Sequence, residues 1–86
     1  MNSEKYYVAR INRQSGRIDL QRCKCLDNSW VTPEYAKRMP HDVWQFSKRG
    51  AQNIADRYNE RASRNWYKYF IIPVSNILNN EQEENK

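Results

Sequence analysis

Three arginines in the second half of the chain are spaced so that their side chains point in a common direction. Arg57, Arg61 and Arg64, here called the arginine stripe, follow one another at intervals of four and three residues, which places them on one side of a helix with about 3.6 residues per turn. Guanidinium groups pair with phosphates and carboxylates and stack on flat rings. The spacing predicts a cationic binding surface, formed by the stripe together with Lys48, Arg49, Arg13, Arg17 and Lys68.

The charge of the whole chain favours the same chemistry. Lys and Arg number 15 against 10 Asp and Glu, and three of the acidic residues lie between residues 81 and 84. The rest of the chain is therefore more basic than the net charge of +5 indicates. A basic protein attracts nucleic acids and acidic protein surfaces, with an affinity that falls as salt rises. Solubility alone is the other interpretation of a charge of this size.

Residues that commonly carry catalysis are few. His41 is the only histidine, and Cys23 and Cys25 are the only cysteines. A zinc site prefers four Cys or His ligands, and a catalytic Cys–His pair needs a third group that orients the histidine. Asp56 and Glu60 lie four residues apart, where ion pairing with neighbouring arginines is their expected role. We therefore predict a non-enzymatic protein with no metal and no cofactor.

The sequence also bears on the compartment. No apolar run approaches the roughly 18 residues that span a bilayer, and the N-terminus lacks the apolar core of a signal peptide. We expect a cytoplasmic protein with no membrane association. Cys23 and Cys25 are separated by one residue in a strand-like run, and we expect both to stay reduced thiols.

The arginine stripe needs a long helix to position it, which we place at residues 47–64. Ser47 is suited to cap its N-terminus. The residues predicted to form its buried face repeat with the helical period and are Ala51, Ile54, Ala55, Tyr58 and Ala62. Burial of this face would direct the arginine stripe along one flank of the helix.

Strands are predicted on both sides of this helix in the sequence. Residues 6–11 and 17–22 alternate in polarity, and Gly16 in the turn between them supplies the positive φ of a tight hairpin. Residues 66–74 are rich in strand-forming side chains, and pairing should end near Pro73 because proline lacks an N–H donor.

The remaining segments complete an α+β fold. A short helix is predicted at residues 32–38, with Thr32 as its cap and Pro40 beyond its end. Residues 43–46 are expected to be a brief strand or extended link that delivers Trp44 or Phe46 to the core. The predicted fold is a small, mainly antiparallel sheet, made of the N-terminal hairpin and the C-terminal strand. One long helix covers one face of this sheet, so the fold has two layers, and there is a short extra helix.

Length and tail composition define the domain organisation. Residues 1–78 are expected to form one α+β domain, since 86 residues leave no room for a second. Residues 79–86 contain no apolar side chain and predict an acidic flexible tail.

A set of structural residues extends along most of the chain: Tyr6, Tyr7, Val8, Trp30, Ala36, Phe46, Ser47, Ala51, Ala55, Trp66, Tyr69 and Ile71. With the order of elements, this set resembles short uncharacterised proteins of bacteriophages and mobile elements of Gram-positive bacteria. Some of those proteins are host-takeover or anti-CRISPR-type inhibitors. The resemblance implies a setting in the host cytoplasm and a host or defence protein as partner.

Two functions follow as hypotheses. The first is a non-enzymatic phage-type protein that inhibits a host or defence protein, CRISPR-like systems included, or a nucleoprotein complex. The alternative is direct binding of DNA or RNA through the arginine stripe and the Arg13 and Arg17 turn. A homodimer through a sheet edge or an aromatic surface is compatible with either hypothesis.

Overall fold

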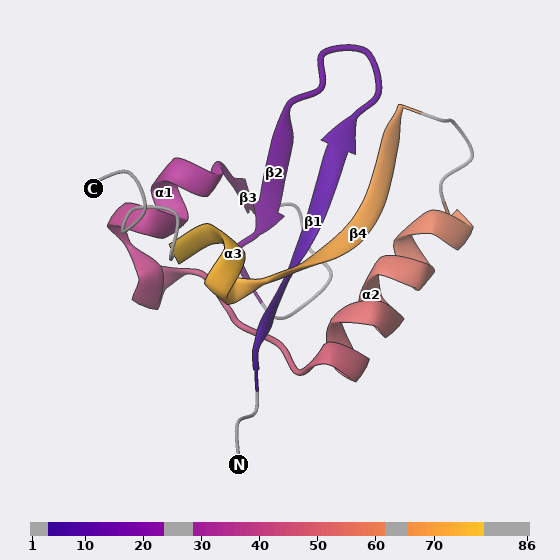
Figure 1. The fold of residues 1–86 in the computed structure, drawn as a ribbon. Helices are drawn as coiled ribbons and strands as arrows, with labels where there is room; N and C mark the ends of the chain where they lie inside the picture. The colour runs from indigo at the N-terminus through magenta and orange to yellow at the C-terminus, as the bar shows by residue number, and fades with distance from the viewer. Residues whose placement is uncertain (1–3, 24–28, 62–65, 79–86) are drawn as a thin grey trace.

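A four-stranded antiparallel sheet with helices on both faces organises the chain in the computed structural model (Figure 1). The structure describes residues 4–23, 29–61 and 66–78. The strand order is β3-β2-β1-β4, and the strands are β1 (Tyr6–Asn12), β2 (Ile18–Gln21), β3 (Trp30–Val31) and β4 (Tyr67–Pro73). The predicted α+β class, with its N-terminal hairpin and C-terminal strand, is confirmed.

The β1–β2 turn has the predicted chemistry. Gly16 adopts a φ of 77°, a conformation that other residues rarely take. The Asn12 side-chain oxygen accepts hydrogen bonds from the backbone N–H groups of Gln14 and Ser15 at 2.8 and 3.0 Å. These local bonds fix the register of the hairpin, in which Ala9 lies opposite Leu20.

Helix α2 (Lys48–Arg61) covers one face of the sheet. Ser47 caps it, because the Ser47 hydroxyl accepts a bond from the Gly50 N–H at 3.1 Å. Ala51 and Ala55 are fully buried, and Ile54 and Tyr58 pack at the edge of the same apolar cluster. The predicted buried face is therefore confirmed, while Ala62 and Arg64 lie outside the described residues.

The opposite face of the sheet is also covered, which corrects the expected two-layer arrangement. Helices α1 (Pro33–Arg38) and α3 (Val74–Leu78), with the 3₁₀ helix η1 (Pro40–Asp42), supply this third layer. Tyr7 and Ala9 of β1 pack against Ala36 and Ile77 there. Alternation along β1 explains the two cores, since Tyr6 and Val8 point to the α2 side.

The segment between η1 and α2 is an extended link. Phe46 is 7% exposed and exchanges two backbone hydrogen bonds of 2.7 Å with Tyr6. Trp44 is 48% exposed, so Phe46 rather than Trp44 reaches the core. The predicted cap of α1 is confirmed, because the Thr32 hydroxyl accepts the Tyr35 N–H at 3.1 Å. The predicted tail at residues 79–86 lies outside the described residues.

One side chain of α2 pairs with the outer edge of the sheet. β4 is an edge strand, and its Tyr69 backbone N–H donates to the Asn59 side-chain oxygen at 3.1 Å. The Asn59 side-chain nitrogen donates back to the Tyr69 carbonyl oxygen at 3.0 Å. Asn59 therefore joins α2 to β4 in the manner of a neighbouring strand.

Removing this pairing should destabilise the fold measurably. We expect Asn59→Ala to lower the free energy of unfolding by about 1–2 kcal/mol relative to Asn53→Ala, because two hydrogen bonds are lost only in the first variant. Asn53 is exposed on the same helix, so its substitution provides the same gain in helix propensity. Urea unfolding measures the difference. Equal stabilities would mean that water replaces Asn59 without cost.

Candidate functional site

The α2 side of the sheet continues beyond the apolar core toward the β1–β2 turn. Tyr6, Val8 and Ile71 belong to the apolar cluster of α2. Alternation then brings Arg10 of β1 to the same side, and Arg10 lies opposite Tyr69 of β4 and Asp19 of β2. An arginine and an aspartate therefore lie in the middle of the sheet, just beyond the apolar cluster that α2 forms with it.

The guanidinium group of Arg10 contacts two aromatic rings. The guanidinium carbon lies 4.4 Å from the centre of the Trp30 ring and 4.3 Å from that of the Tyr67 ring. Arg10 Nε also donates to Asp19 Oδ2 at 3.3 Å. The Arg10 and Asp19 side chains are only 21% and 13% exposed. Cation–π contacts and an ion pair that is partly shielded from water fix the arginine in place.

Behind Arg10, aromatic rings join α2 to the sheet. Tyr58 stacks on Tyr69 with ring centres 4.7 Å apart and an angle of 14° between the planes. The centre of the Trp30 ring lies 5.6 Å from that of Tyr58 and 5.9 Å from that of Tyr69. These contacts make Tyr58 and Tyr69 packing residues, so Trp30 and Tyr67 are the rings next to the charged pair.

A polar pocket of about 330 Å³ opens over this pair. We call it the sheet pocket, and its lining residues are Arg10, Asn12, Ser15, Arg17, Asp19, Trp30 and Tyr67. Arg17 Nε lies 3.5 Å from Asp19 Oδ1, and the Arg17 side chain is 69% exposed. Beyond the pocket, the Arg13 N–H donates to the Trp66 carbonyl oxygen at 2.9 Å, and Trp66 is 52% exposed.

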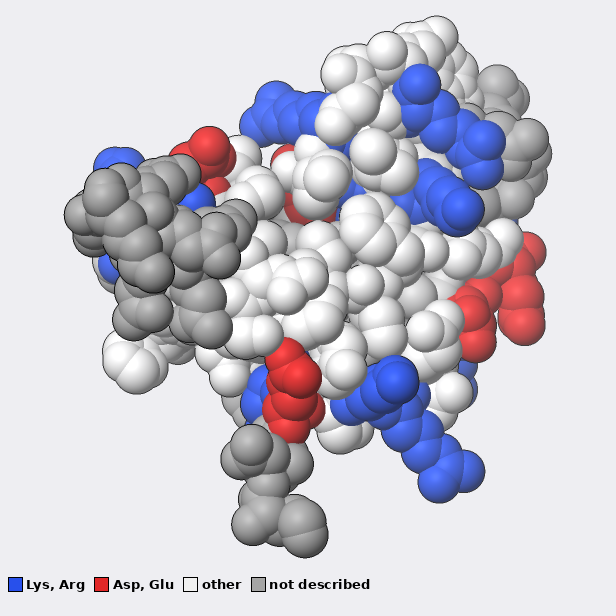
Figure 2. All heavy atoms as spheres, in the orientation of Figure 1, with Lys and Arg blue, Asp and Glu red and all other residues white. Residues whose placement is uncertain are grey.

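Positive charge gathers at this end of the molecule. Figure 2 shows Lys and Arg side chains over the end of the sheet that carries the β1–β2 turn, and a smaller group at the opposite end. Much of the surface between them is uncharged in this view. The turn contributes Arg13 and Arg17, both exposed.

The predicted site residues do not form one patch. Exposed Lys68 lies opposite Ile11 in the sheet, close to the turn. Arg57 and Arg61 are exposed on α2, as the stripe predicts, and Arg64 lies outside the described residues. Lys48 and Arg49 begin α2, about 20 Å along the helix from Arg61. They are therefore separated from the turn arginines.

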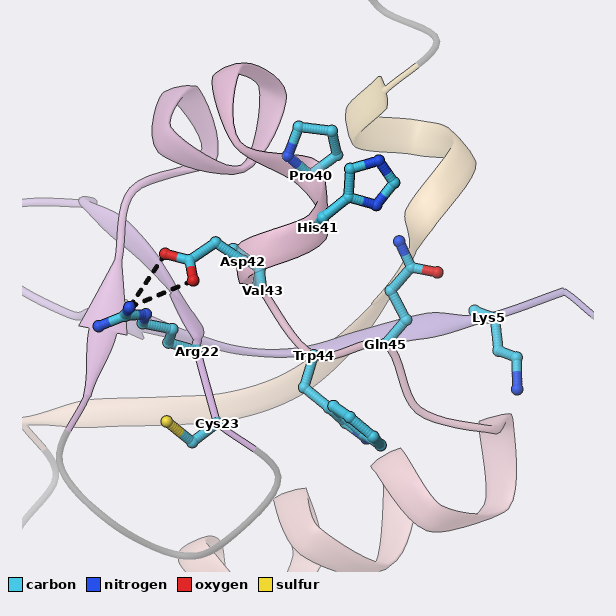
Figure 3. Close-up of a pocket in the computed structure, with 9 residues that line it drawn as sticks. All are labelled: Lys5, Arg22, Cys23, Pro40, His41, Asp42, Val43, Trp44 and Gln45. Atoms are coloured by element: carbon cyan, nitrogen blue, oxygen red, sulfur yellow. Dashed lines mark hydrogen bonds and ion pairs between the residues drawn. The ribbon is translucent and has the colours of Figure 1, made fainter.

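A second cleft lies on the other side of the fold, around the link that follows η1 (Figure 3). Its volume is about 750 Å³, and its lining includes Lys5, Arg22, His41 and Trp44. Figure 3 shows His41 and Cys23 on opposite sides of the link, which does not favour a catalytic pair. Cys23 is a free, half-buried thiol, and Cys25 lies outside the described residues.

An ionic network supports one wall of this cleft. Arg22 Nη2 lies 3.0 Å from Asp42 Oδ2 and 3.2 Å from Oδ1, and the Tyr35 hydroxyl donates to Oδ2. The bond from Tyr35 and then that from Arg22 hold the pKa of Asp42 below its usual 3.8. The same bond to Asp42, with some burial, raises the pKa of Tyr35.

The lowered pKa of Asp42 predicts how its contribution depends on pH. The folded state binds this proton less tightly than the unfolded chain, so the stabilisation is complete above pH 3.8 and is lost as pH falls through the folded-state pKa. We expect Asp42→Asn to lower the melting temperature at pH 7, with the difference from the unmodified protein shrinking in acid. Asp56→Asn, at an exposed position, is the control. A difference that persists at low pH would contradict the assignment.

Metal ligands and membrane-spanning helices were sought among the described residues. In those ranges, no three His, Cys, Asp or Glu side chains gather as metal ligands would. Across the same part of the chain, no helix has the length and apolar character needed to cross a membrane. No family model, curated protein or solved structure matches the chain. Function is therefore inferred from the geometry of the two surfaces.

Sequence reasoning missed the residues at the centre of the sheet pocket. The alternation of residues 6–11 places Arg10 on the same face of the strand as Tyr6 and Val8, and this pattern is the only local indication of where Arg10 lies. It could not show that Trp30 and Tyr67 flank the guanidinium group, since these rings arrive from two distant segments.

Proposed function

We propose that this protein acts without catalysis, by binding single-stranded DNA or RNA at the end of its sheet that carries the β1–β2 turn. The observation that carries the proposal is the guanidinium group of Arg10, held between Trp30 and Tyr67 beside an open pocket and an arginine-bearing turn. Arginine and aromatic side chains on a rigid sheet are suited to bind bases, because each base offers a flat face for stacking.

The surroundings of the pocket support a single strand over a duplex. Trp66 is half exposed, and its backbone is hydrogen-bonded to that of Arg13, so an exposed ring and a cationic residue belong to neighbouring segments at this end of the sheet. Bases in a duplex are already stacked and paired, and only an unpaired strand can turn a base into a pocket. Arg13 and Arg17 would then contact the backbone.

Binding to labelled strands of about ten nucleotides tests this proposal. We expect single-stranded DNA and RNA to bind more tightly than the matching duplex. With about four phosphate contacts, affinity should fall roughly 50-fold between about 50 and 200 mM salt. Fluorescence anisotropy measures both quantities. Absence of binding at the lowest salt, or a duplex bound equally well, would overturn the proposal.

The arginine stripe provides a further prediction. Arg57→Glu combined with Arg61→Glu should weaken strand binding about tenfold without loss of folding, because both side chains are exposed and the core face of α2 is unchanged. Gln at the same two positions should give a smaller loss and a shallower salt dependence. If the variant with both Glu substitutions bound the strand with full affinity, these arginines would belong to a solvated face that does not contact the ligand.

Inhibition of a host or defence protein is the second candidate function, as the phage-protein resemblance implies. One observation favours it: Trp44 is 48% exposed in the cleft of about 750 Å³, and Lys5 belongs to the same lining. Exposed tryptophans flanked by cations are suited to anchor a protein surface that carries acidic side chains.

Paired substitutions separate the two candidates. Trp66 and Trp44 are similarly exposed but lie at different surfaces. If nucleic acid is the ligand, Trp66→Ala should weaken strand binding and Trp44→Ala should not. If a protein is the ligand, co-purification from host cells should give a stoichiometric complex that Trp44→Ala disrupts and Trp66→Ala preserves.

A further inference from the structure

The sheet pocket has the size and rigidity of a site for one small, flat group. Its volume of about 330 Å³ is at the lower end of ligand pockets, which span roughly 300–1,000 Å³. Arg10, Asp19, Trp30 and Tyr67 come from four different strands. Side chains fixed to strands hold their geometry better than side chains on loops.

Arg10 and Asp19 place a donor and an acceptor side by side in this pocket. Their ion pair uses Arg10 Nε and Asp19 Oδ2 at 3.3 Å. The terminal amino groups of Arg10 are further donors, and each carboxylate oxygen can accept more than one hydrogen bond. Contacts with the rings of Trp30 and Tyr67 restrict Arg10, so the direction of its donors is set before a ligand arrives.

The second oxygen of Asp19, Oδ1, can be freed for a ligand with little loss of stabilising free energy. It faces Arg17 Nε at 3.5 Å, and the Arg17 side chain is 69% exposed. An ion pair that is open to solvent at such a distance contributes little. Arg17 can therefore turn toward a phosphate and leave Asp19 Oδ1 to a ligand.

This combination of groups excludes some ligands and fits one base in particular. A bare phosphate would meet the Asp19 carboxylate, and like charges repel. A base avoids this conflict. Guanine carries two adjacent N–H donors on one edge, which match the two oxygens of a carboxylate, and its O6 and N7 acceptors match an arginine fork. We propose that the sheet pocket binds one unstacked guanine base, paired with Asp19 and Arg10.

The proposal rests on the proposed binding of single strands, and a comparison of bases tests the two separately. The probes are labelled strands of about ten dT nucleotides, with the central position changed to dG, dA or dC. We expect dG to raise affinity about tenfold over the other three, the size of one good paired contact. Equal binding of all four would overturn the guanine proposal alone. Binding of none would overturn both.

Inosine tests the role of Asp19 without altering the protein. Its base, hypoxanthine, differs from guanine in lacking the exocyclic amino group, so one of the two donors to the carboxylate is lost. We expect the preference to fall from about tenfold to about threefold or less. Inosine bound as tightly as guanine would overturn the pairing with Asp19.

Asp19→Asn provides the matching change in the protein. The amide keeps the size of the side chain but replaces one acceptor with a donor, so the preference for dG over dT should fall to about twofold or less. Binding of the all-dT strand should persist. Asp56→Asn, which removes the same charge from an exposed position on α2, should keep the full preference. A full preference in Asp19→Asn would overturn the proposal, and the inosine comparison decides the matter if that variant does not fold.

Discussion

Replacing Arg13 and Arg17 together with Glu should reduce affinity for single-stranded nucleic acid by about 100-fold or more at low salt. Two phosphate contacts are lost, and two negative charges are introduced at the rim of the sheet pocket. Both side chains are exposed on the β1–β2 turn, so the fold should survive. Anisotropy measures the affinity, and circular dichroism confirms that the variant is folded.

The matched control carries the same change of charge at a distant position. Lys48 and Arg49 are exposed at the start of α2, and their replacement by Glu also reverses two positive charges. We expect this pair to weaken binding only several-fold, through the general field of the protein. If both double variants lost affinity to a similar extent, net charge rather than the β1–β2 turn would determine binding.

Replacing Ala55 with Asp should unfold the domain at room temperature. Ala55 is fully buried between α2 and the sheet, so the new carboxylate would lack both space and water. An unpaired buried charge costs several kcal/mol, and a domain of 86 residues has a total stability of about 4–13 kcal/mol. Circular dichroism should report the loss of helix and of a cooperative melting transition.

Asn53→Asp introduces the same side chain at an exposed position two residues earlier on α2. This variant should fold normally, since its carboxylate stays in water. If Ala55→Asp melted like the unmodified protein, the orientation of α2 on the sheet would be wrong.

Local features of the sequence predicted much of the fold. The spacing of Ala51 and Ala55 specified the buried face of α2, and Gly16 specified the turn of the hairpin. Thr32 followed by Pro33 specified the start of α1. Each of these features acts within a few residues, where propensity and hydrogen bonding leave few alternatives.

Features that depend on distant segments were not predictable in the same way. Strand β3 has only two residues, too few for a periodic pattern. Helix α3 has only five residues, and it begins at the residue where the predicted strand 66–74 ends. Both owe their positions to partners elsewhere in the chain. The third layer over Tyr7 and Ala9 needs α3 beside α1, and without α3 the sequence indicated only two layers.

The candidate site shows the same division. Helical spacing alone aligned Arg57 and Arg61, and the structure leaves both exposed. The position of Arg10 between two rings depends on the antiparallel register of β1 with β4 and on the arrival of Trp30 from β3. Such registers are set by long-range pairing, which no local pattern of residues specifies.

The pairing of Asn59 with Tyr69 also restricts how copies of the chain can meet. An edge strand presents unpaired backbone groups that invite a strand from another molecule. At the middle of β4 those groups are already bonded to Asn59, and the opposite edge, β3, is only two residues long. A continuous intermolecular sheet would first have to break the Asn59 bonds. Self-association should therefore proceed through side-chain surfaces such as the exposed tryptophans, and crowding of the protein should not seed fibrous growth from β4.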